Sequence, residues 1–241
     1  MELRLAWATD PGLAREENED SVFVSTDMGQ LDALLVIADG MGGHAAGQVA
    51  SKLVADTVSD ELSNAGAIGG EELKALLTKV NTTVYQASLA KAENAGMGST
   101  LVMAAIRDGR LTLLNVGDSP AYLIRSGTVT EIYQNHSWPS EQARAGIISA
   151  DQVANHPQKH RLARAVGVWD HVKAFTNELD LEKGDLVILC SDGVEEAGVT
   201  VDEVRNLLEN DDLQTAVEDL VDLCRARGAP DNVSVAAVRV D

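Results

Sequence analysis

Four aspartates in this sequence each stand where an apolar run meets a turn. Asp39 ends the run Leu34–Ala38 and precedes a glycine-rich stretch. The other three occur in Gly117-Asp118-Ser119, Ser191-Asp192-Gly193 and Pro230-Asp231-Asn232. Apolar runs of this length are typical of buried strands, which would hold each carboxylate on a rigid support. If the strand ends converge, the acids cannot all stay ionised without cations, and hard oxygen ligands favour Mg²⁺ or Mn²⁺.

A second group of chemically useful residues lies in the charged stretch Gly12–Asp20, between two predicted strands. Such a stretch is usually a solvated loop. However, Arg15 offers a planar fork suited to phosphate, and Glu19 and Asp20 add two further hard ligands or water acceptors. Taken singly, each aspartate at a strand end is more simply explained as an ordinary turn residue, so the chemistry depends on convergence.

Hydrophobic periodicity predicts the elements that would position these residues. Two amphipathic helices, Ala45–Leu62 and Glu71–Glu93, are joined by the loop Ala65–Gly70, and Leu89 is expected to lie on the buried face of the second. Further helices are predicted at Val201–Leu208 and Leu213–Arg227. Short runs separated by tight turns predict antiparallel strands. The predicted strands are Leu3–Thr9, Ser21–Ser25, Leu34–Ala38, Leu101–Ile106, Arg110–Val116, Ala121–Ile124, Val129–Tyr133, Val172–Leu179, Leu186–Cys190 and Val233–Val240.

This order of elements indicates the α+β class, with two sheets packed face to face and helices covering each outer face. The segment His136–Val166 breaks the strand pattern and contains only small helical pieces, so we expect it to form an inserted flap. We treat residues 1–241 as a single domain with this flap at about 136–166.

Composition narrows the class of protein. The chain has 241 residues, 45% of them hydrophobic, and a formal net charge of −19, which disfavours binding to nucleic acid or anionic membranes. Cys190 and Cys224 are far apart and lie in apolar patterns, so buried reduced thiols are expected. Neither a signal peptide nor an apolar run of membrane-spanning length is visible, and we therefore expect a cytoplasmic protein.

Seven stretches in order resemble the metal-dependent Ser/Thr protein phosphatases of type 2C, in their compact bacterial form. Together they span nearly the whole chain. They are Thr9–Gly12 with Arg15 and Asn18–Asp20, Ala38–His44, Gly98–Thr100, Asn115–Ser119, His156-Pro157 with Leu162 and Arg164–Gly167, Cys190–Gly193, and Pro230–Val235.

The resemblance implies an αββα sandwich with a metal cluster at one end of the two sheets. It implies that Asp39 bridges two Mn²⁺ or Mg²⁺ ions, that Asp192 and Asp231 bind one of them, and that the Gly40 carbonyl serves the other. Glu19 would act through water, and Asp118 would join Asp192 at a third, weaker site.

The implied activity is hydrolysis of phosphoserine and phosphothreonine in proteins by a metal-activated bridging water. Asp20 would orient that water and Arg15 would bind the phosphoryl group. The substrates would be phosphorylated proteins, those of a cognate Ser/Thr kinase, and the enzyme would act as a monomer in signalling. His136 and His160, in the flap, are candidates for the acid that protonates the leaving oxygen. Pro120 and Asn135 depart from the family pattern, which puts loop support and substrate contacts in doubt.

Two other functions fit parts of the sequence. Gly40-x-Gly42-x-x-Ala45 after a strand, with Asp60 and Glu61 about twenty residues on, loosely matches a dinucleotide-binding oxidoreductase. An acid directly before these glycines would repel a pyrophosphate, and the predicted strands are antiparallel. A catalytically inactive metal-binding interaction module would be expected to have lost one or more of the acids, and all are present.

Overall fold

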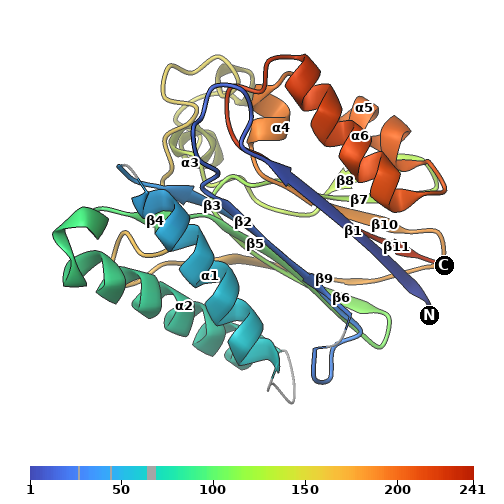
Figure 1. Ribbon diagram of the computed structural model, residues 1–241, viewed down its shortest axis with the longest axis horizontal. Coiled ribbons are helices and arrows are strands. Elements are labelled where there is room, and N and C mark those ends of the chain that lie inside the picture. Colours follow the sequence, from blue (N-terminus) through green and yellow to red (C-terminus); the bar gives the residue numbers. More distant parts are fainter. Residues whose placement is uncertain (27, 44, 64–68) are drawn as a thin grey trace.

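Two antiparallel β-sheets pack face to face in the computed structural model, which describes residues 1–26, 28–43, 45–63 and 69–241 (Figure 1). One sheet has the strand order β1, β11, β10, β7, β8, and the other β2, β3, β5, β6, β9, with β4 paired to the end of β3. The strands are β1 Leu3–Asp10, β2 Asp20–Ser25, β3 Ala33–Met41, β4 Gly98–Ser99, β5 Leu101–Arg107, β6 Arg110–Val116, β7 Ala121–Arg125, β8 Thr128–Glu131, β9 Phe175–Asp180, β10 Leu186–Cys190 and β11 Val233–Val240.

Strand β3 is buried on both faces because it lies between two hydrophobic cores. Within Leu34–Ala38, the even-numbered residues contact the core under the helices, whereas Leu35 and Ile37 face the core between the sheets. Successive strand residues point to opposite faces, so burial on both sides requires an unbroken apolar run. The prediction that this strand ends at Asp39 is wrong, because it continues to Met41 and pairs there with β4.

Helices cover the outer face of each sheet and complete the predicted four-layer α+β sandwich. Helices α1 (Ala46–Ser63) and α2 (Gly70–Ala90) cover the sheet that contains β3 (Figure 1). The other sheet is covered by α4 (Gly193–Glu196), α5 (Val201–Leu208) and α6 (Leu213–Ala226). None of the described helices is long and apolar enough to cross a membrane.

The predicted second helix, Glu71–Glu93, extends past the observed end of α2. Helix α2 ends at Ala90, because Lys91 adopts extended backbone, and the short 3₁₀ helix η1 (Ala92–Asn94) follows. Leu89, expected on the buried face, is 69% exposed. Most of the predicted loop 65–70 lies outside the described residues, and its last residue, Gly70, begins α2.

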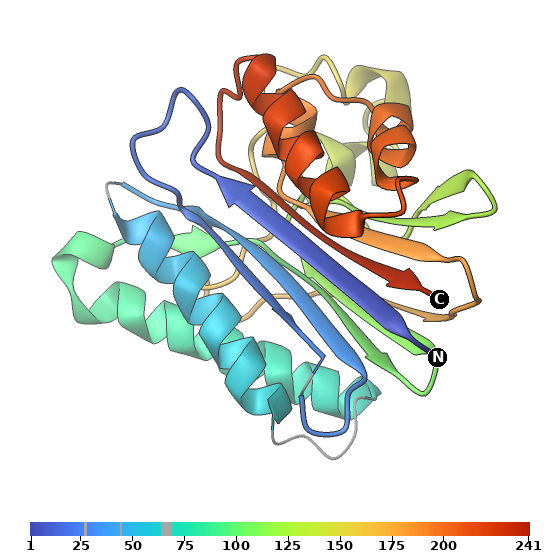
Figure 2. The ribbon, with the colours of Figure 1, turned by 45° about the vertical axis from the view of Figure 1, so that its right-hand side comes forward.

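The flap is tied to the sandwich at both of its ends. It contains α3 (Trp138–Arg144) and the 3₁₀ helix η2 (Ala150–Gln152). The His136 N–H donates to the Gly117 carbonyl at 3.0 Å, and a bridge joins Val166 to Ser99 of β4. A further bridge, within the flap, joins Ser137 to Leu162. The flap lies beside the ends of β3 and β4, whereas the two chain termini lie side by side at the opposite end of the sandwich (Figures 1 and 2).

Candidate metal and phosphate site

A cavity of about 490 Å³ opens at the flap end of the sandwich. All the site residues predicted from the sequence line this cavity except Asp20 and the candidate acid His136. The lining residues are Arg15, Glu19, Asp39, Gly40, Met41, Gly42, Thr100, Asp118, His160, Leu162, Asp192, Glu196, Asp231 and Asn232.

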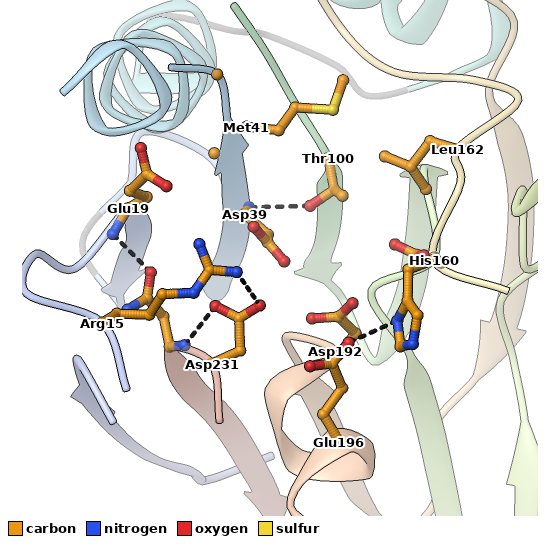
Figure 3. Close-up of a pocket in the computed structure, with 14 residues that line it drawn as sticks. Arg15, Glu19, Asp39, Met41, Thr100, His160, Leu162, Asp192, Glu196 and Asp231 are labelled. Carbon is orange, nitrogen blue, oxygen red and sulfur yellow. Dashed lines mark hydrogen bonds and ion pairs between the residues drawn. The ribbon is translucent and has the colours of Figure 1, made fainter. Parts of the chain in front are cut away.

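Four carboxylates reach this cavity from four separate elements. Asp39 lies near the end of β3, Asp118 follows β6, Asp192 is the N-cap of α4, and Asp231 precedes β11. Figure 3 shows the side chains of Asp39, Asp192 and Asp231 pointing toward one another. The fold therefore converts positions far apart in the sequence into one cluster of hard oxygen donors.

Burial raises the pKa of Asp39 and of Asp192 well above the ordinary carboxyl value, and the neighbouring acids add to the effect. Burial likewise raises the pKa of Asp118 to about 7. Like charges in a desolvated site disfavour the ionised form unless opposite charge is supplied. The cluster therefore favours either bound protons or bound cations.

Glu19 and Asp20 present buried carboxylate oxygens that lack a partner. Glu19 Oε1 and Asp20 Oδ1 accept no hydrogen bond from the described residues. Burial raises the pKa of both carboxyls, that of Asp20 to about 6, although Ser234 Oγ donates to Asp20 Oδ2 at 2.6 Å. Buried oxygens of this kind are usually completed by an ion or a water molecule.

Asp20 stands opposite Asp39 in the ladder between β2 and β3, and it is not among the lining residues of the cavity. Its negative charge contributes to the raised pKa of Asp39. In this structure Asp20 thus acts on the site from the neighbouring strand β2, through its charge on Asp39.

Arg15 enters the cavity from the loop between β1 and β2. Its Nη2 donates a hydrogen bond to Asp231 Oδ2 at 2.6 Å (Figure 3). Partial burial lowers the pKa of Arg15, but the charge and the hydrogen bond of Asp231 outweigh this and raise it. Arg15 is therefore a permanent cation placed among the acids.

Asn232 fixes the loop that carries Arg15 and Glu19. Its side-chain nitrogen donates to the carbonyl oxygens of Pro11 and Glu17, both at 2.9 Å, and its side-chain oxygen accepts from the Glu19 N–H at 2.8 Å. Asn232 is only 4% exposed. Three hydrogen bonds from one buried amide hold an irregular loop at the start of β11. The sequence offers only the turn-like Pro-Asp-Asn as a signal for this role.

Thr100 plays a similar part for Asp39. Its Oγ1 accepts a hydrogen bond from the Asp39 N–H at 2.9 Å and lies 2.7 Å from Ser119 Oγ. The hydroxyl thus links β3 to the turn that carries Asp118. The stretch Gly98–Thr100 contributes to the resemblance described above, but its pattern alone does not reveal this contact.

The two histidines named as candidate acids differ, because one is buried and the other lies at the cavity. Burial lowers the pKa of His136 to about 4, and its Nδ1 accepts from the Gly117 N–H at 3.1 Å. His136 does not line the cavity, so its role is structural. His160 lines the cavity, with its Nδ1 2.6 Å from Glu196 Oε1. His44 lies outside the described residues.

Gly47, at the start of α1, leaves the space that the Glu19 carboxylate occupies. A Cβ added to Gly47 would lie 2.4 Å from Glu19 Oε1. We expect Gly47→Ala to displace Glu19 and to weaken Mn²⁺ binding several-fold, although alanine is the better helix former by about 1 kcal/mol. Isothermal titration of the metal-stripped protein with Mn²⁺ measures this effect.

Gly43→Ala is the matched control, because a Cβ there would meet nothing within 4 Å. It should leave Mn²⁺ affinity unchanged. Equal Mn²⁺ affinities for the Gly47→Ala variant and the parent protein would mean that the space beside Gly47 is not needed to position Glu19 for the metal.

Comparison with known proteins agrees with this geometry. The family model described as protein phosphatase 2C matches residues 14–235. The chain is 33% identical over 241 residues to a serine/threonine phosphatase Stp of Listeria monocytogenes, covering 97% of this chain and 94% of that protein. It is 32% identical over 240 residues to the serine/threonine protein phosphatase PstP of Mycobacterium tuberculosis, covering 99% of this chain and 45% of PstP.

Solved structures show the same architecture. A crystal structure of the Mycobacterium tuberculosis phosphatase PstP matches with a TM-score of 0.89, at 32% identity and 99% coverage of both chains. The catalytic domain of PstP in complex with two manganese ions matches with a TM-score of 0.84, at 32% identity and 99% coverage of both chains. Since the family model covers most of the sequence and these relatives cover nearly all of it, the chain belongs to the protein phosphatase 2C family.

Proposed function

We propose that the cavity is the active site of a metal-dependent serine/threonine protein phosphatase, with Asp39, Asp192 and Asp231 as the principal cation ligands. The phosphatase class and the dependence on Mn²⁺ or Mg²⁺ follow from membership of the family and from its similarity to PstP. The observation that carries the assignment of residues is the convergence of four aspartates beside Arg15 in one cavity.

The donor set fits Mn²⁺ or Mg²⁺. Six of the residues that line the cavity carry carboxylates, and the backbone of Gly40 adds a carbonyl, which are the ligands that these hard cations prefer. The Glu19 oxygen that lacks a hydrogen-bond partner and the raised pKa values of Asp39 and Asp192 also fit a cation site, because a bound cation would pair with these groups and stabilise their ionised forms. Asp118 would contribute to a third ion together with Asp192.

Each residue of the cavity has a distinct task in hydrolysis. Divalent cations bound here supply positive charge beside the phosphoryl group and activate water for attack on phosphorus. Arg15 binds and orients the phosphoryl oxygens through its planar fork. Asp20 stands beside Asp39 in the ladder between β2 and β3, where we expect it to orient the attacking water. No protein nucleophile is required: the bond from phosphorus to the serine or threonine oxygen breaks as the bond to the water oxygen forms, and His160, which lines the cavity, is the candidate to protonate the leaving oxygen.

The dinucleotide-binding alternative does not agree with the fold. All strand pairings given for the described residues are antiparallel, whereas a dinucleotide-binding crossover needs adjacent parallel strands. An inactive binding module is also disfavoured, because the full set of acids reaches the cavity.

We further propose that residues 1–241 form a single catalytic domain that acts as a monomer in the cytoplasm, in signalling. Its substrates would be proteins phosphorylated by a cognate Ser/Thr kinase. The names of the relatives as serine/threonine phosphatases support the substrate class. The free, buried Cys190 and Cys224 are compatible with a reducing compartment.

Hydrolysis of p-nitrophenyl phosphate and of a phosphothreonine peptide tests the proposal. EDTA should silence both activities and excess Mn²⁺ should restore them. Because the cations supply the activated water, residual activity in EDTA should be lower by at least about a thousandfold. Unchanged activity in EDTA would contradict the metal-dependent mechanism.

A further inference from the structure

The contact between Arg15 and Asp231 joins the proposed phosphoryl-binding cation directly to a proposed metal ligand. Asp231 Oδ2 accepts from Arg15 at 2.6 Å, while its Oδ1 accepts from the Asn232 N–H at 2.8 Å. Both oxygens of this carboxylate therefore already have donors. Any divalent cation that binds Asp231 shares the carboxylate with a guanidinium.

The loop around Arg15 is anchored independently of this ion pair. The Leu13 N–H donates to the Ala229 carbonyl at 3.0 Å, and Asn232 holds the carbonyl of Glu17. Among the described residues, Asp231 is the only hydrogen-bond partner of the Arg15 side chain, which is 48% exposed. The side chain can therefore leave Asp231 while the loop stays in place.

We infer that Arg15 is an internal counter-cation that couples metal affinity at Asp231 to phosphoryl binding, a role that rests on the proposed function. Without an anion, the guanidinium opposes the binding of a second positive charge at Asp231. A phosphoryl anion draws Arg15 away and leaves Asp231 to the metal. By linkage, the anion then tightens the metal through Arg15 as much as the metal tightens the anion.

Titration of metal-stripped protein with Mn²⁺ alone tests the first half of this inference. Arg15→Ala should tighten the Mn²⁺ site that includes Asp231 by roughly three- to tenfold, the range expected for removing one partly screened charge. Arg15→Lys keeps the charge and should remain within about twofold of the parent protein. Arg225→Ala is the matched control, since Arg225 is also 48% exposed and pairs with Asp10; it should leave Mn²⁺ affinity unchanged.

Repeating the titrations with inorganic phosphate tests the second half. Phosphate contacts metal ions in every variant, so only the difference between variants reports on Arg15. The tightening of Mn²⁺ by phosphate should be at least about threefold larger in the parent protein than in Arg15→Ala.

Unchanged or weaker Mn²⁺ binding by Arg15→Ala, at an unaltered unfolding temperature, would overturn the inference and leave Arg15 as a simple support for Asp231. That failure is distinct from failure of the proposed function. If the parent protein binds no Mn²⁺, the proposed metal site is wrong. If it binds Mn²⁺ and hydrolyses phosphopeptide, the proposed function holds even where the inference about Arg15 fails.

Discussion

Asp39→Asn is expected to abolish turnover and, at the same time, to stabilise the cation-free protein. Asparagine has nearly the same shape, and the hydrogen bond from the backbone N–H of residue 39 to Thr100 is independent of the side chain. The amide, however, brings no negative charge to share between cations. Turnover of p-nitrophenyl phosphate at saturating Mn²⁺ should fall by at least about a thousandfold, roughly 4 kcal/mol of transition-state stabilisation.

The expected gain in stability of the cation-free protein arises from the cost of holding the Asp39 charge in the site. Burial raises the pKa of Asp39, and its repulsion from Asp20, Asp192 and Asp118 adds to the cost of ionising it. Removing one charge from this group should stabilise the folded state by about 1–3 kcal/mol, which raises the midpoint of thermal unfolding in EDTA by several degrees. Active sites commonly trade stability for function in this way.

Asp56→Asn provides the control for both effects. Asp56 lies on α1, where its half-exposed side chain pairs with Lys52 four residues earlier. Neither turnover nor the unfolding midpoint should change appreciably, because exposed pairs of this kind contribute only about 0.3–0.5 kcal/mol. Turnover above about a tenth of the parent value in Asp39→Asn would refute the ligand role; a lower midpoint in EDTA would refute the repulsion argument.

The central strands could be predicted because burial on both faces requires an unbroken apolar run, which is visible in the sequence. Arg110–Val116 and Leu186–Cys190 have the predicted bounds, and both are almost entirely buried. The hairpin before β6 is equally local, since Asp108 and Gly109 adopt φ of 50° and 76° in its turn. Two-sided burial and tight turns depend on neighbouring residues alone.

Boundaries that depend on distant partners could not be predicted. Strand β3 extends to Met41 because Met41 pairs with Gly98 of β4. The sequence near Met41 does not indicate this distant partner. Leu89 fits the helical period of α2 but lies in its last turn, where it remains exposed. Helix α4 has only four residues and is too short for a periodic pattern.

The same division applies to the site. The candidate aspartates could be found because four acids recur beside apolar runs and lie in stretches that together resemble one family. The supporting residues were not, because their types are ordinary and their partners remote. Asn232 holds Glu17 across 215 positions, and Thr100 holds Asp39 across 61. Gly47 matters because the Glu19 carboxylate and the Gly40 carbonyl lie against it.

The pH dependence of the free energy of unfolding should report on the ionisation of Asp118. Its pKa is raised from 3.8 to about 7, first by burial and then by Glu195 and Glu196. The unfolded chain therefore releases this proton near pH 4, whereas the folded protein keeps it until about pH 7. Since the folded state binds more protons in this window, Asp118 lowers the free energy of unfolding as pH rises through it. The loss is a few kcal/mol and is complete above about pH 7.

His136 has the opposite effect in part of the same window. Burial lowers its pKa from 6.5 to about 4, so the unfolded state binds the extra proton and stability rises with pH between these values. The comparison must therefore be made between variants. Asp118→Asn removes the contribution of Asp118 and retains that of His136. In EDTA, the difference in free energy of unfolding between this variant and the parent protein should grow in favour of the variant from pH 4 to pH 7.

Urea unfolding at several pH values, in EDTA and in Mn²⁺, measures this difference. In Mn²⁺ the advantage of Asp118→Asn should shrink or reverse as pH rises, because the parent carboxylate gains a cation that the amide cannot hold. A difference independent of pH in EDTA would mean that Asp118 ionises in the folded protein as it does in the unfolded chain. A difference unaffected by Mn²⁺ would remove Asp118 from the metal ligands while leaving the effect of burial in place.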